Sequence, residues 1–366
     1  MLRNMNITKT PLITVIVDTF NHEKYIEKAL KSVFEQEYPR DNFEVIVVDD
    51  GSSDNTPILL RQYEGQVQIV EKQNGGQASA FNAAIPLARG EIVAFLDGDD
   101  WWAKDKLHSI TTAFTADPLL GVVGHGFYEF DENERHVKAV VPEIGSCVTI
   151  QDKSDGIEFS QKMCFFGTSR VAIRKRVLNM VGQIPEALVV EADEYLSTVA
   201  IAKSRGIMLQ QPLTFYRLHA DNLYYFRNGD ETRMRRKMSV LMTLGKALTE
   251  TLFPVCANRE VVEALVAPIN LEAHKLKLQL ENGWPWETFR VERASRRLAY
   301  SHATWKYQVF SLMSLALTLL LSPKIYYRLQ KFYSAMNLKR LRRFTGEPVP
   351  MAKIKHYSED KNDGQS

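Results

Sequence analysis

Apolar positions in the first hundred residues follow two different spacings. Residues 12–17 and 43–48 are continuous apolar runs, whereas the apolar residues between 25 and 34 recur at helical spacing. The runs predict buried strands, and the segment between them predicts a helix over 21–37, so that the three form a strand–helix–strand unit of a parallel sheet. The same criteria predict strands over 67–70 and 92–96 and helices over 57–63 and 78–88.

Polar or acidic residues follow each of these four predicted strands. In open α/β sheets, ligands bind beyond the carboxyl ends of the parallel strands. One shared ligand explains four such endings better than four unrelated turns. The endings are Asp18-Thr19, Asp49-Asp50, Lys72 to Gly76, and Asp97 to Asp100.

The last of these endings, Asp97-Gly98-Asp99-Asp100, concentrates three carboxylates in four residues. Carboxylates this close raise one another's pKa unless a cation screens them, and Mg²⁺ or Mn²⁺ prefers such oxygen ligands, usually shared with substrate phosphates. A metal-bridged diphosphate is therefore the first hypothesis. The alternative is an acidic turn that caps a helix beginning near Lys104.

The middle of the chain predicts a second, less regular half. A strand is expected over 121–130 and a β-rich insertion over 137–150, followed by a Gly-Thr-Ser turn at 167–169. Acidic residues at 191, 193 and 194 precede a helix that begins near 196. A last strand over 210–218 runs into Arg217-Leu218-His219.

From about residue 230 the pattern is helical. The apolar run 309–321 has 13 residues, fewer than the ~20 needed to span a bilayer. Basic and aromatic residues alternate after it as far as 344, which suits a membrane surface with anionic lipid, so that 309–344 is a candidate for peripheral membrane contact. The alternative is a solvated helix face, and the C-terminal helices could also pair two chains into an oligomer.

Composition excludes several classes of protein. The net charge of +2 over 366 residues gives no sign of nucleic-acid binding. Three widely spaced cysteines predict neither a disulfide framework nor a zinc site. The first eleven residues lack the apolar core of a signal peptide, so a cytoplasmic location is expected, with the inner face of the cell membrane as the place of any lipid contact.

Four ordered segments resemble the family 2 glycosyltransferases: 14–21 (TVIVDTFN), 47–54 (VVDDGSSD), 74–82 (NGGQASAFN) and 95–102 (FLDGDDWW). The resemblance implies a GT-A type fold, an α/β architecture whose Rossmann-like, mixed and mainly parallel sheet is flanked by helices and followed by a C-terminal helical region. It also implies an inverting transferase with a nucleotide-diphosphate sugar donor and Mg²⁺ or Mn²⁺. The expected organisation is an N-terminal extension (1–10), a catalytic domain (11–228), a helical region (229–349) and a disordered tail (350–366). The catalytic domain divides into a nucleotide-sugar-binding half (11–110) and an acceptor-binding half (111–228).

The resemblance also implies roles for individual residues. Asp50 would accept a hydrogen bond from the imide N–H of the base. Asp99 would bind the metal directly, with Asp97 near the ribose or the metal and His219 on the metal or a phosphate. The full nucleotide-sugar set is Asp18, Thr19, Asn21, Asp50, Gly75, Gly76, Gln77, Asn82, Asp97, Gly98 and Arg217, and the metal set is Asp99, Asp97 and His219.

Inversion requires a general base that deprotonates the acceptor hydroxyl. The family usually has Glu-Asp before a helix at this place, whereas this chain has Asp193-Glu194, so the order of the acids is reversed. Asp193 is the favoured catalytic base and Glu194 is the alternative, with Glu191 as a third choice. Three acids that only stabilise a helix N-terminus would be the structural explanation.

The leading hypothesis is transfer of a sugar to a hydroxyl of a glycan or lipid-linked acceptor in cell-surface polysaccharide biosynthesis. A polyprenyl-phosphate sugar synthase and a catalytically silent nucleotide-sugar-binding scaffold are the alternatives. A dinucleotide-dependent dehydrogenase is excluded, because no GxGxxG follows Val17. The donor base, the sugar, the linkage and the acceptor stay open.

Overall fold

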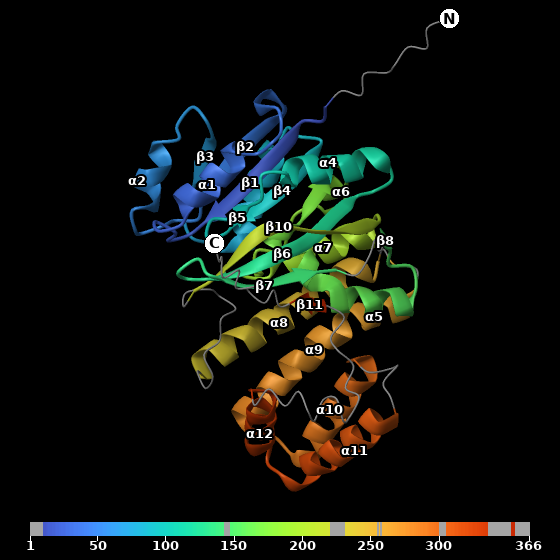
Figure 1. Cartoon of the computed structure of the whole chain (residues 1–366). Coiled ribbons are helices and arrows are strands. Elements are labelled where there is room, and N and C mark those ends of the chain that lie inside the picture. Colours follow the sequence, from blue (N-terminus) through green and yellow to red (C-terminus); the bar gives the residue numbers. More distant parts are fainter. Residues whose placement is uncertain are drawn as a thin grey trace, which may run out of the picture. The chain divides into compact units, whose positions relative to one another are not determined.

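A mixed β-sheet forms the centre of the N-terminal part of the computed structural model (Figure 1). The structure describes residues 10–142, 147–219, 231–254, 256, 258–299, 305–335 and 353–355. The chain divides into two compact units. Unit 1 comprises Met1–Thr149, Lys162–Asn222 and Ala352–Ser366, and unit 2 comprises Ile150–Gln161 and Leu223–Met351.

The first half of unit 1 alternates strands and helices, as the apolar pattern predicts, and its strands β3, β2, β1 and β4 are parallel neighbours in that order. Its elements are β1 (Ile13–Thr19), α1 (Ile26–Phe34), β2 (Phe43–Asp49), α2 (Thr56–Arg61), β3 (Gln68–Glu71), α3 (Gln77–Ala84), β4 (Ile92–Asp97), β5 (Trp101–Trp102) and α4 (Lys106–Ala116).

The second half continues the same sheet with mostly antiparallel pairs. Strand β9 is antiparallel to both β4 and β6, and the long strand β10 runs parallel to β6 and antiparallel to β5. Its elements are β6 (Val122–Asp131), β7 (His136–Val141), β8 (Cys147–Val148), β9 (Ala172–Arg174), α6 (Lys175–Val181), α7 (Ala192–Ala202), β10 (Gly206–Leu218) and β11 (Lys353–Lys355), which pairs with β7.

The core of unit 1 explains the continuous apolar runs. Val15 and Ile16 of β1 point to opposite faces of the sheet, and both are fully buried. On one face Val15 and Val17 belong to the same apolar cluster as Ile26 and Leu30 of α1. A strand covered on both faces needs apolar residues at every position, which is why these runs do not alternate.

Two of the predicted helices are shorter in the structure, for local reasons. Residue Asn21 has a left-handed backbone (φ 57°), and its Oδ1 accepts a hydrogen bond from the Ser53 N–H at 2.8 Å, so α1 begins only at Ile26. Helix α3 ends at Ala84, where a 3₁₀ turn containing Pro86 follows; proline lacks the N–H that a continuing α-helix needs.

Unit 2 consists of helices, in which α8 and α9 pack along each other, α10 contacts α9 and α11, and α12 contacts α9. Glu292 of α10 is buried. Its Oε2 lies 3.5 Å from the Arg296 Nε, and its Oε1 lies 3.7 Å from the Nζ of Lys275 in α9. Among the described helices, none is both long and apolar enough to cross a membrane. The helices are α5 (Lys153–Lys162), α8 (Glu231–Leu252), α9 (Arg259–Glu281), α10 (Pro285–Ala299), α11 (Trp305–Leu320) and α12 (Pro323–Ala335).

The expected boundary at 228/229 and the N-terminal extension stay predictions, and residues 1–9 and 220–230 lie outside the described residues. Residues 150–161, expected within the acceptor half, are grouped with unit 2. Of the expected disordered tail, only the short strand at 353–355 is described. The cysteines Cys147, Cys164 and Cys256 are free.

The turn after β3 packs closely against the loop before α7. Gly76 has φ +81°, and a Cβ at this position would lie 2.5 Å from the Val189 Cα. Gly65 has the same φ, but a Cβ there would meet no atom within 4 Å. The two glycines therefore share a positive φ, and only Gly76 is closely packed.

We predict that Gly76→Ala destabilises unit 1 by about 1–3 kcal/mol more than Gly65→Ala does, because overpacking adds to the backbone strain that both variants share. Urea unfolding of the two variants, monitored under identical conditions, measures the difference. Equal midpoints would contradict the close packing at Gly76.

Candidate active site

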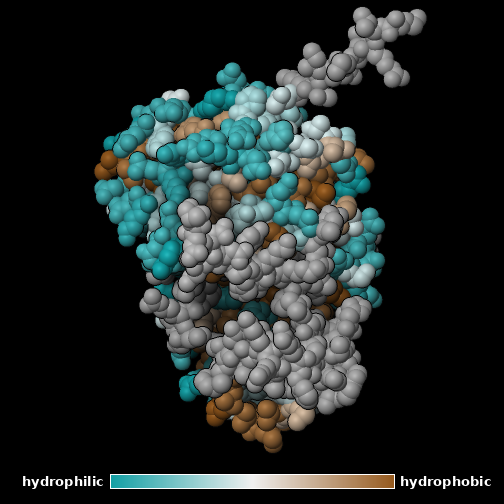
Figure 2. Space-filling view, in the orientation of Figure 1, coloured by the Kyte–Doolittle hydropathy of each residue, from teal (hydrophilic) through white to brown (hydrophobic). Residues whose placement is uncertain are grey.

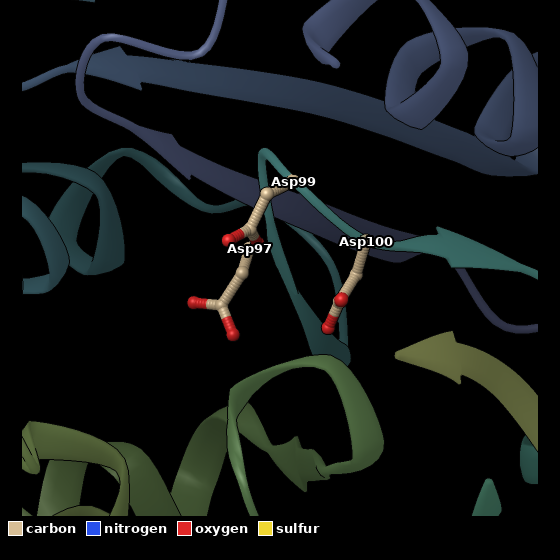
Figure 3. A group of neighbouring side chains, drawn as sticks. All are labelled: Asp97, Asp99 and Asp100. Carbon is tan, nitrogen blue, oxygen red and sulfur yellow. The ribbon is translucent and has the colours of Figure 1, made fainter. Parts of the chain in front are cut away.

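Four carboxylates meet where β1 and β4 end. The parallel register sets Asp18 of β1 directly opposite Asp97 of β4, and the turn from β4 to β5 adds Asp99 and Asp100. One carboxylate oxygen from each of Asp97, Asp99 and Asp100 lies within 4.8 Å of the others. In Figure 3 all three side chains extend downward from this turn. The structure thus brings together the acids that the sequence singles out.

The turn that carries these acids is compact. The Gly98 N–H donates to the Asp18 carbonyl at 2.9 Å, and a Cβ on Gly98 would lie 2.7 Å from the Thr19 Oγ1 and 2.8 Å from the His22 Nδ1. Only glycine fits between these side chains without a shift. Gly98 therefore lets Asp97 and Asp99 approach the end of β1.

Burial and mutual repulsion disfavour the charged forms of most of these acids. Burial, followed by the charge of Asp99, raises the pKa of Asp18 well above its usual range. Burial and the charge of Asp18 do the same to the pKa of Asp97. Burial and the charge of Asp99 raise the pKa of Asp100 to about 7. The positive charges near these three acids therefore do not offset burial and repulsion.

Asp99 is the exception, because two histidines face it. The His219 Nε2 lies 2.9 Å and the His22 Nε2 lies 3.9 Å from the Asp99 Oδ2. Although burial opposes them, these histidines lower the pKa of Asp99. Burial in turn lowers the pKa of His22. His22 is absent from the residues predicted from sequence; its place three residues after Thr19, at a strand end, is the signal that could have identified it.

A divalent cation fits this donor set. The Asp18 Oδ1 and the Asp100 Oδ2 are buried and accept no hydrogen bond within the described part of the chain. Carboxylate oxygens are the ligands that Mg²⁺ and Mn²⁺ prefer, and a cation beside Asp97 and Asp99 would offset the repulsion that raises their neighbours' pKa values. Asp97, Asp99 and Asp100 are close enough together to hold it, and a ligand role for the imidazole of His219 stays a prediction.

Arg217 supplies a positive charge beside the carboxylate turn, and its Nη1 also lies 3.1 Å from the Glu134 Oε1. Its side chain is buried, and its Nε donates to the Asp99 carbonyl at 3.0 Å, while its backbone N–H donates to the Asp100 Oδ1 at 2.9 Å. The guanidinium also lies 4.7 Å from the ring centroids of Tyr25 and Trp101. These contacts fix its position beside the carboxylate turn.

Asp193 reaches the same region from the N-terminus of α7. Its Oδ2 accepts hydrogen bonds from the N–H and the Oγ1 of Thr168, at 2.9 and 3.1 Å. Its charge also raises the pKa values of Asp18 and Asp97, although burial and the charge of Asp99 raise them more. Asp193 is therefore both near the carboxylates and held by Thr168.

Thr168 and Ser169 were not predicted as site residues. The Ser169 Oγ accepts a hydrogen bond from the Asp97 N–H at 3.0 Å and donates to the Asp97 Oδ2 at 3.3 Å. The short 3₁₀ helix Thr168–Arg170 thus contacts Asp97 through one residue and Asp193 through its neighbour. The only sequence signal was the Gly-Thr-Ser turn.

Two predicted ligand residues, the side-chain amides Gln77 and Asn82, form hydrogen bonds within the protein. The Gln77 side chain donates to the Thr168 Oγ1 at 2.8 Å and accepts from the Ala192 N–H at 2.9 Å, so it fixes the start of α7. Both polar groups of the Asn82 amide bind the backbone of Ile184. These contacts give the two amides positioning roles, and ligand binding by either stays a prediction.

Asp50 likewise makes contacts within the chain. It accepts hydrogen bonds from the N–H groups of Gly75 and Gly76, at 3.0 and 2.7 Å, and from the Lys72 Nζ at 2.6 Å. The carboxylate therefore shapes the glycine turn. Its expected contact with the base stays a prediction.

Comparison with known proteins finds similar sequences among glycosyltransferases. The model of glycosyl transferase family 2 matches residues 14–177. An uncharacterized glycosyltransferase of Nostoc is 32% identical over 215 residues, which are 57% of this chain and 66% of that protein. The poly(ribitol-phosphate) β-N-acetylglucosaminyltransferase TarS of Staphylococcus aureus is 40% identical over 98 residues, which are 26% of this chain and 17% of TarS. The chain thus matches less than two thirds of the length of either relative.

Solved structures confirm the fold class. The S. aureus TarS structure with UDP-GlcNAc has a TM-score of 0.57 at 22% identity, with 87% of this chain and 92% of that chain covered. A mannosyltransferase of Pyrobaculum calidifontis, solved with GDP-Man and Mn²⁺, has a TM-score of 0.50 at 22% identity, with 93% and 89% covered. The predicted GT-A type architecture is therefore confirmed. The carboxylate turn, Thr168 and Ser169 all lie inside residues 14–177, the part of the chain that belongs to glycosyl transferase family 2.

Proposed function

We propose that the protein is a metal-dependent, inverting glycosyltransferase that moves a sugar from a nucleotide-diphosphate sugar to a hydroxyl of a glycan or lipid-linked acceptor. The observation that carries the proposal is the meeting of the Asp97–Asp99–Asp100 group with Asp193, which comes from a different element. Binding of a metal-bridged diphosphate needs only the first group. A transfer reaction also needs a base beside that group, and Asp193 is the carboxylate proposed for this role.

On the donor side, Mg²⁺ or Mn²⁺ held by Asp97, Asp99 and His219 would stabilise the negative charge of the departing diphosphate. Arg217, fixed beside the same turn, adds a permanent positive charge for that leaving group. The residues proposed to bind the nucleoside are Asp18, Thr19, Asn21 and Asp50, together with the glycine turn at Gly75 and Gly76 that Asp50 holds. TarS, solved with UDP-GlcNAc, and the P. calidifontis enzyme, solved with GDP-Man and Mn²⁺, support this class of donor and cofactor.

On the acceptor side, Asp193 is the proposed general base. Two hydrogen bonds from Thr168 to one oxygen, and one from the Glu194 N–H to the other, hold the carboxylate in one orientation. A base aligned in this way takes the proton of the acceptor hydroxyl as that oxygen attacks the anomeric carbon opposite the diphosphate. Attack from that side inverts the configuration.

The proposed setting is the synthesis of a cell-surface polysaccharide, at the inner face of the cell membrane. The likeness to TarS, whose name gives a poly(ribitol-phosphate) acceptor, supports a polymeric acceptor as a class. Asp193 disfavours the silent scaffold, because nucleotide-sugar binding alone requires no base.

Asp99→Asn is expected to abolish metal-dependent donor binding, because the variant loses the carboxylate that the two histidines keep ionised. Thermal-shift titrations with UDP-, GDP- and dTDP-sugars, each with Mn²⁺, Mg²⁺ or EDTA, measure this binding. Asp105→Asn is the control, because Asp105 is exposed and makes no capping hydrogen bond at the start of α4. A metal-dependent shift retained in Asp99→Asn would contradict the assigned ligand.

Asp193→Asn should leave donor binding unchanged and lower kcat by a factor of ~10² or more, because asparagine can still accept the hydrogen bonds from Thr168 but cannot take a proton. Glu194→Gln is the matched variant and should lose less. Steady-state kinetics with the donor identified by thermal shift give the comparison. The opposite ranking of the two variants would make Glu194 the base.

The pH dependence of stability provides an independent test of the carboxylate turn. The Asp100 pKa is about 7 in the folded protein and near 3.8 in an unfolded chain, so the folded state binds this proton more tightly. The contribution of Asp100 to the free energy of unfolding is therefore largest below pH ~4 and falls as the pH rises toward ~7. Without metal, Asp100→Asn should flatten this fall, which thermal melts in EDTA between pH 4 and 8 measure. Identical pH profiles for the variant and the wild type would exclude the effect.

A further inference from the structure

From residue 312 to its end, helix α11 presents an outer face without exposed polar side chains. In this segment, only Leu315 and Thr318 are buried, and Ser314 is half-buried. Every exposed residue of this segment is apolar. The exposed residues are Leu312, Met313, Ala316, Leu317, Leu319 and Leu320.

This face is broad. At 3.6 residues per turn, these six positions cover an arc of about 160° around the helix. The five large side chains among them are 45–78% exposed. A helix on the surface of a globular protein normally turns charged or polar residues to water on this side. The composition of the face therefore indicates that something covers it.

The apolar surface continues onto α12. Ile325 and Leu329, one helical turn apart, are each 51% exposed, whereas Tyr326 and Tyr327 are buried against α9. Figure 2 shows apolar side chains gathered at the lower end of the view, where the turn between α11 and α12 lies in Figure 1. We use the name α11–α12 hairpin for residues 305–335.

Most of the charges around this surface are basic. Lys324 and Arg328 are exposed on α12; Lys324 lies 4.0 Å from the exposed Glu231, and Arg328 forms no ion pair among the described residues. On α10, which packs against α11, Arg293 is also exposed. Residues 293–346 include eleven lysines and arginines and no aspartate or glutamate.

We propose that the α11–α12 hairpin docks on the surface of an anionic lipid bilayer, with its apolar face in the interface and Lys324 and Arg328 at the lipid phosphates. Helix α11 has 16 residues, fewer than the ~20 that span a bilayer, so it lies in the interface instead of crossing it. A second copy of the chain is the poorer occupant, because it would bring an equally basic surface against this one. Anionic headgroups complement it. The proposal does not depend on the transfer reaction.

Co-sedimentation of the full chain with phosphatidylcholine vesicles, with and without 30 mol% phosphatidylglycerol, tests the docking. The apolar variant Leu312→Gln/Met313→Gln/Leu320→Gln should bind the anionic vesicles at least tenfold less tightly than the wild type. Its matched control is Ile58→Gln/Leu119→Gln/Met180→Gln, which changes three side chains of unit 1 that are 50–68% exposed and should bind like the wild type. All six positions are exposed, so these substitutions are not expected to unfold the chain.

The charge variant Lys324→Gln/Arg328→Gln should bind the anionic vesicles roughly thirtyfold less tightly and should change binding to neutral vesicles little. Its control, Lys104→Gln/Lys246→Gln, removes two other exposed lysines, one from each unit. Thermal melts of all variants confirm that they are folded. Absence of vesicle binding by the folded wild type, or binding that neither variant weakens, would overturn the proposal. So would a wild-type dimer, seen by light scattering, that the apolar variant dissociates and that does not bind vesicles.

Discussion

The crowding of carboxylates at one edge of a parallel sheet is the constraint on which the active site depends. Because β1 lies between β2 and β4 in parallel register, Asp18 and Asp97 are at the same level, and the turn after β4 adds two more acids. Burial makes their charges costly and their mutual repulsion adds to that cost. The arrangement is stable as a charged group only with cations beside it, and the same need makes it suited to bind a metal with a diphosphate.

The second half of unit 1 supplies what this edge lacks. Strand β10 returns alongside β5 and β6, which places Arg217 and His219 at the carboxylate turn although more than a hundred residues separate them in the chain. The 3₁₀ helix after Gly167 contacts Asp97 through Ser169 and Asp193 through Thr168. The proposed metal ligand Asp97 and the proposed base Asp193 are therefore joined through two adjacent residues of one short element.

In unit 2, by contrast, the buried carboxylate has cations of the same unit beside it. The buried Glu292 forms ion pairs with Arg296 and Lys275, and Arg296 also donates to the Tyr326 hydroxyl at 2.9 Å, which ties α10 to α12. With that network inside, the outer face of α11 carries no charge from residue 312 onward. The rest of the interior of unit 2 is mostly apolar, with Leu244, Leu248 and Val262 buried, so the uncharged outer face of α11 is an apolar surface in addition to the core.

The sequence alone determined the alternation of elements, the presence of acids at four strand ends and the family, because each depends on local spacing or on contiguous motifs. It also named Asp18, Asp97, Asp99, Arg217 and His219, which the structure brings into one region. The aspartates followed from the shared edge of parallel strands, whereas Arg217 and His219 followed from the family resemblance. Only the tertiary structure showed that His22, Thr168 and Ser169 belong to the site, and that Gln77 and Asn82 bind neighbouring backbone. These contacts join residues up to about 115 positions apart through single hydrogen bonds. No periodicity or short motif records a partner at that distance, and therefore only the folded chain decides it.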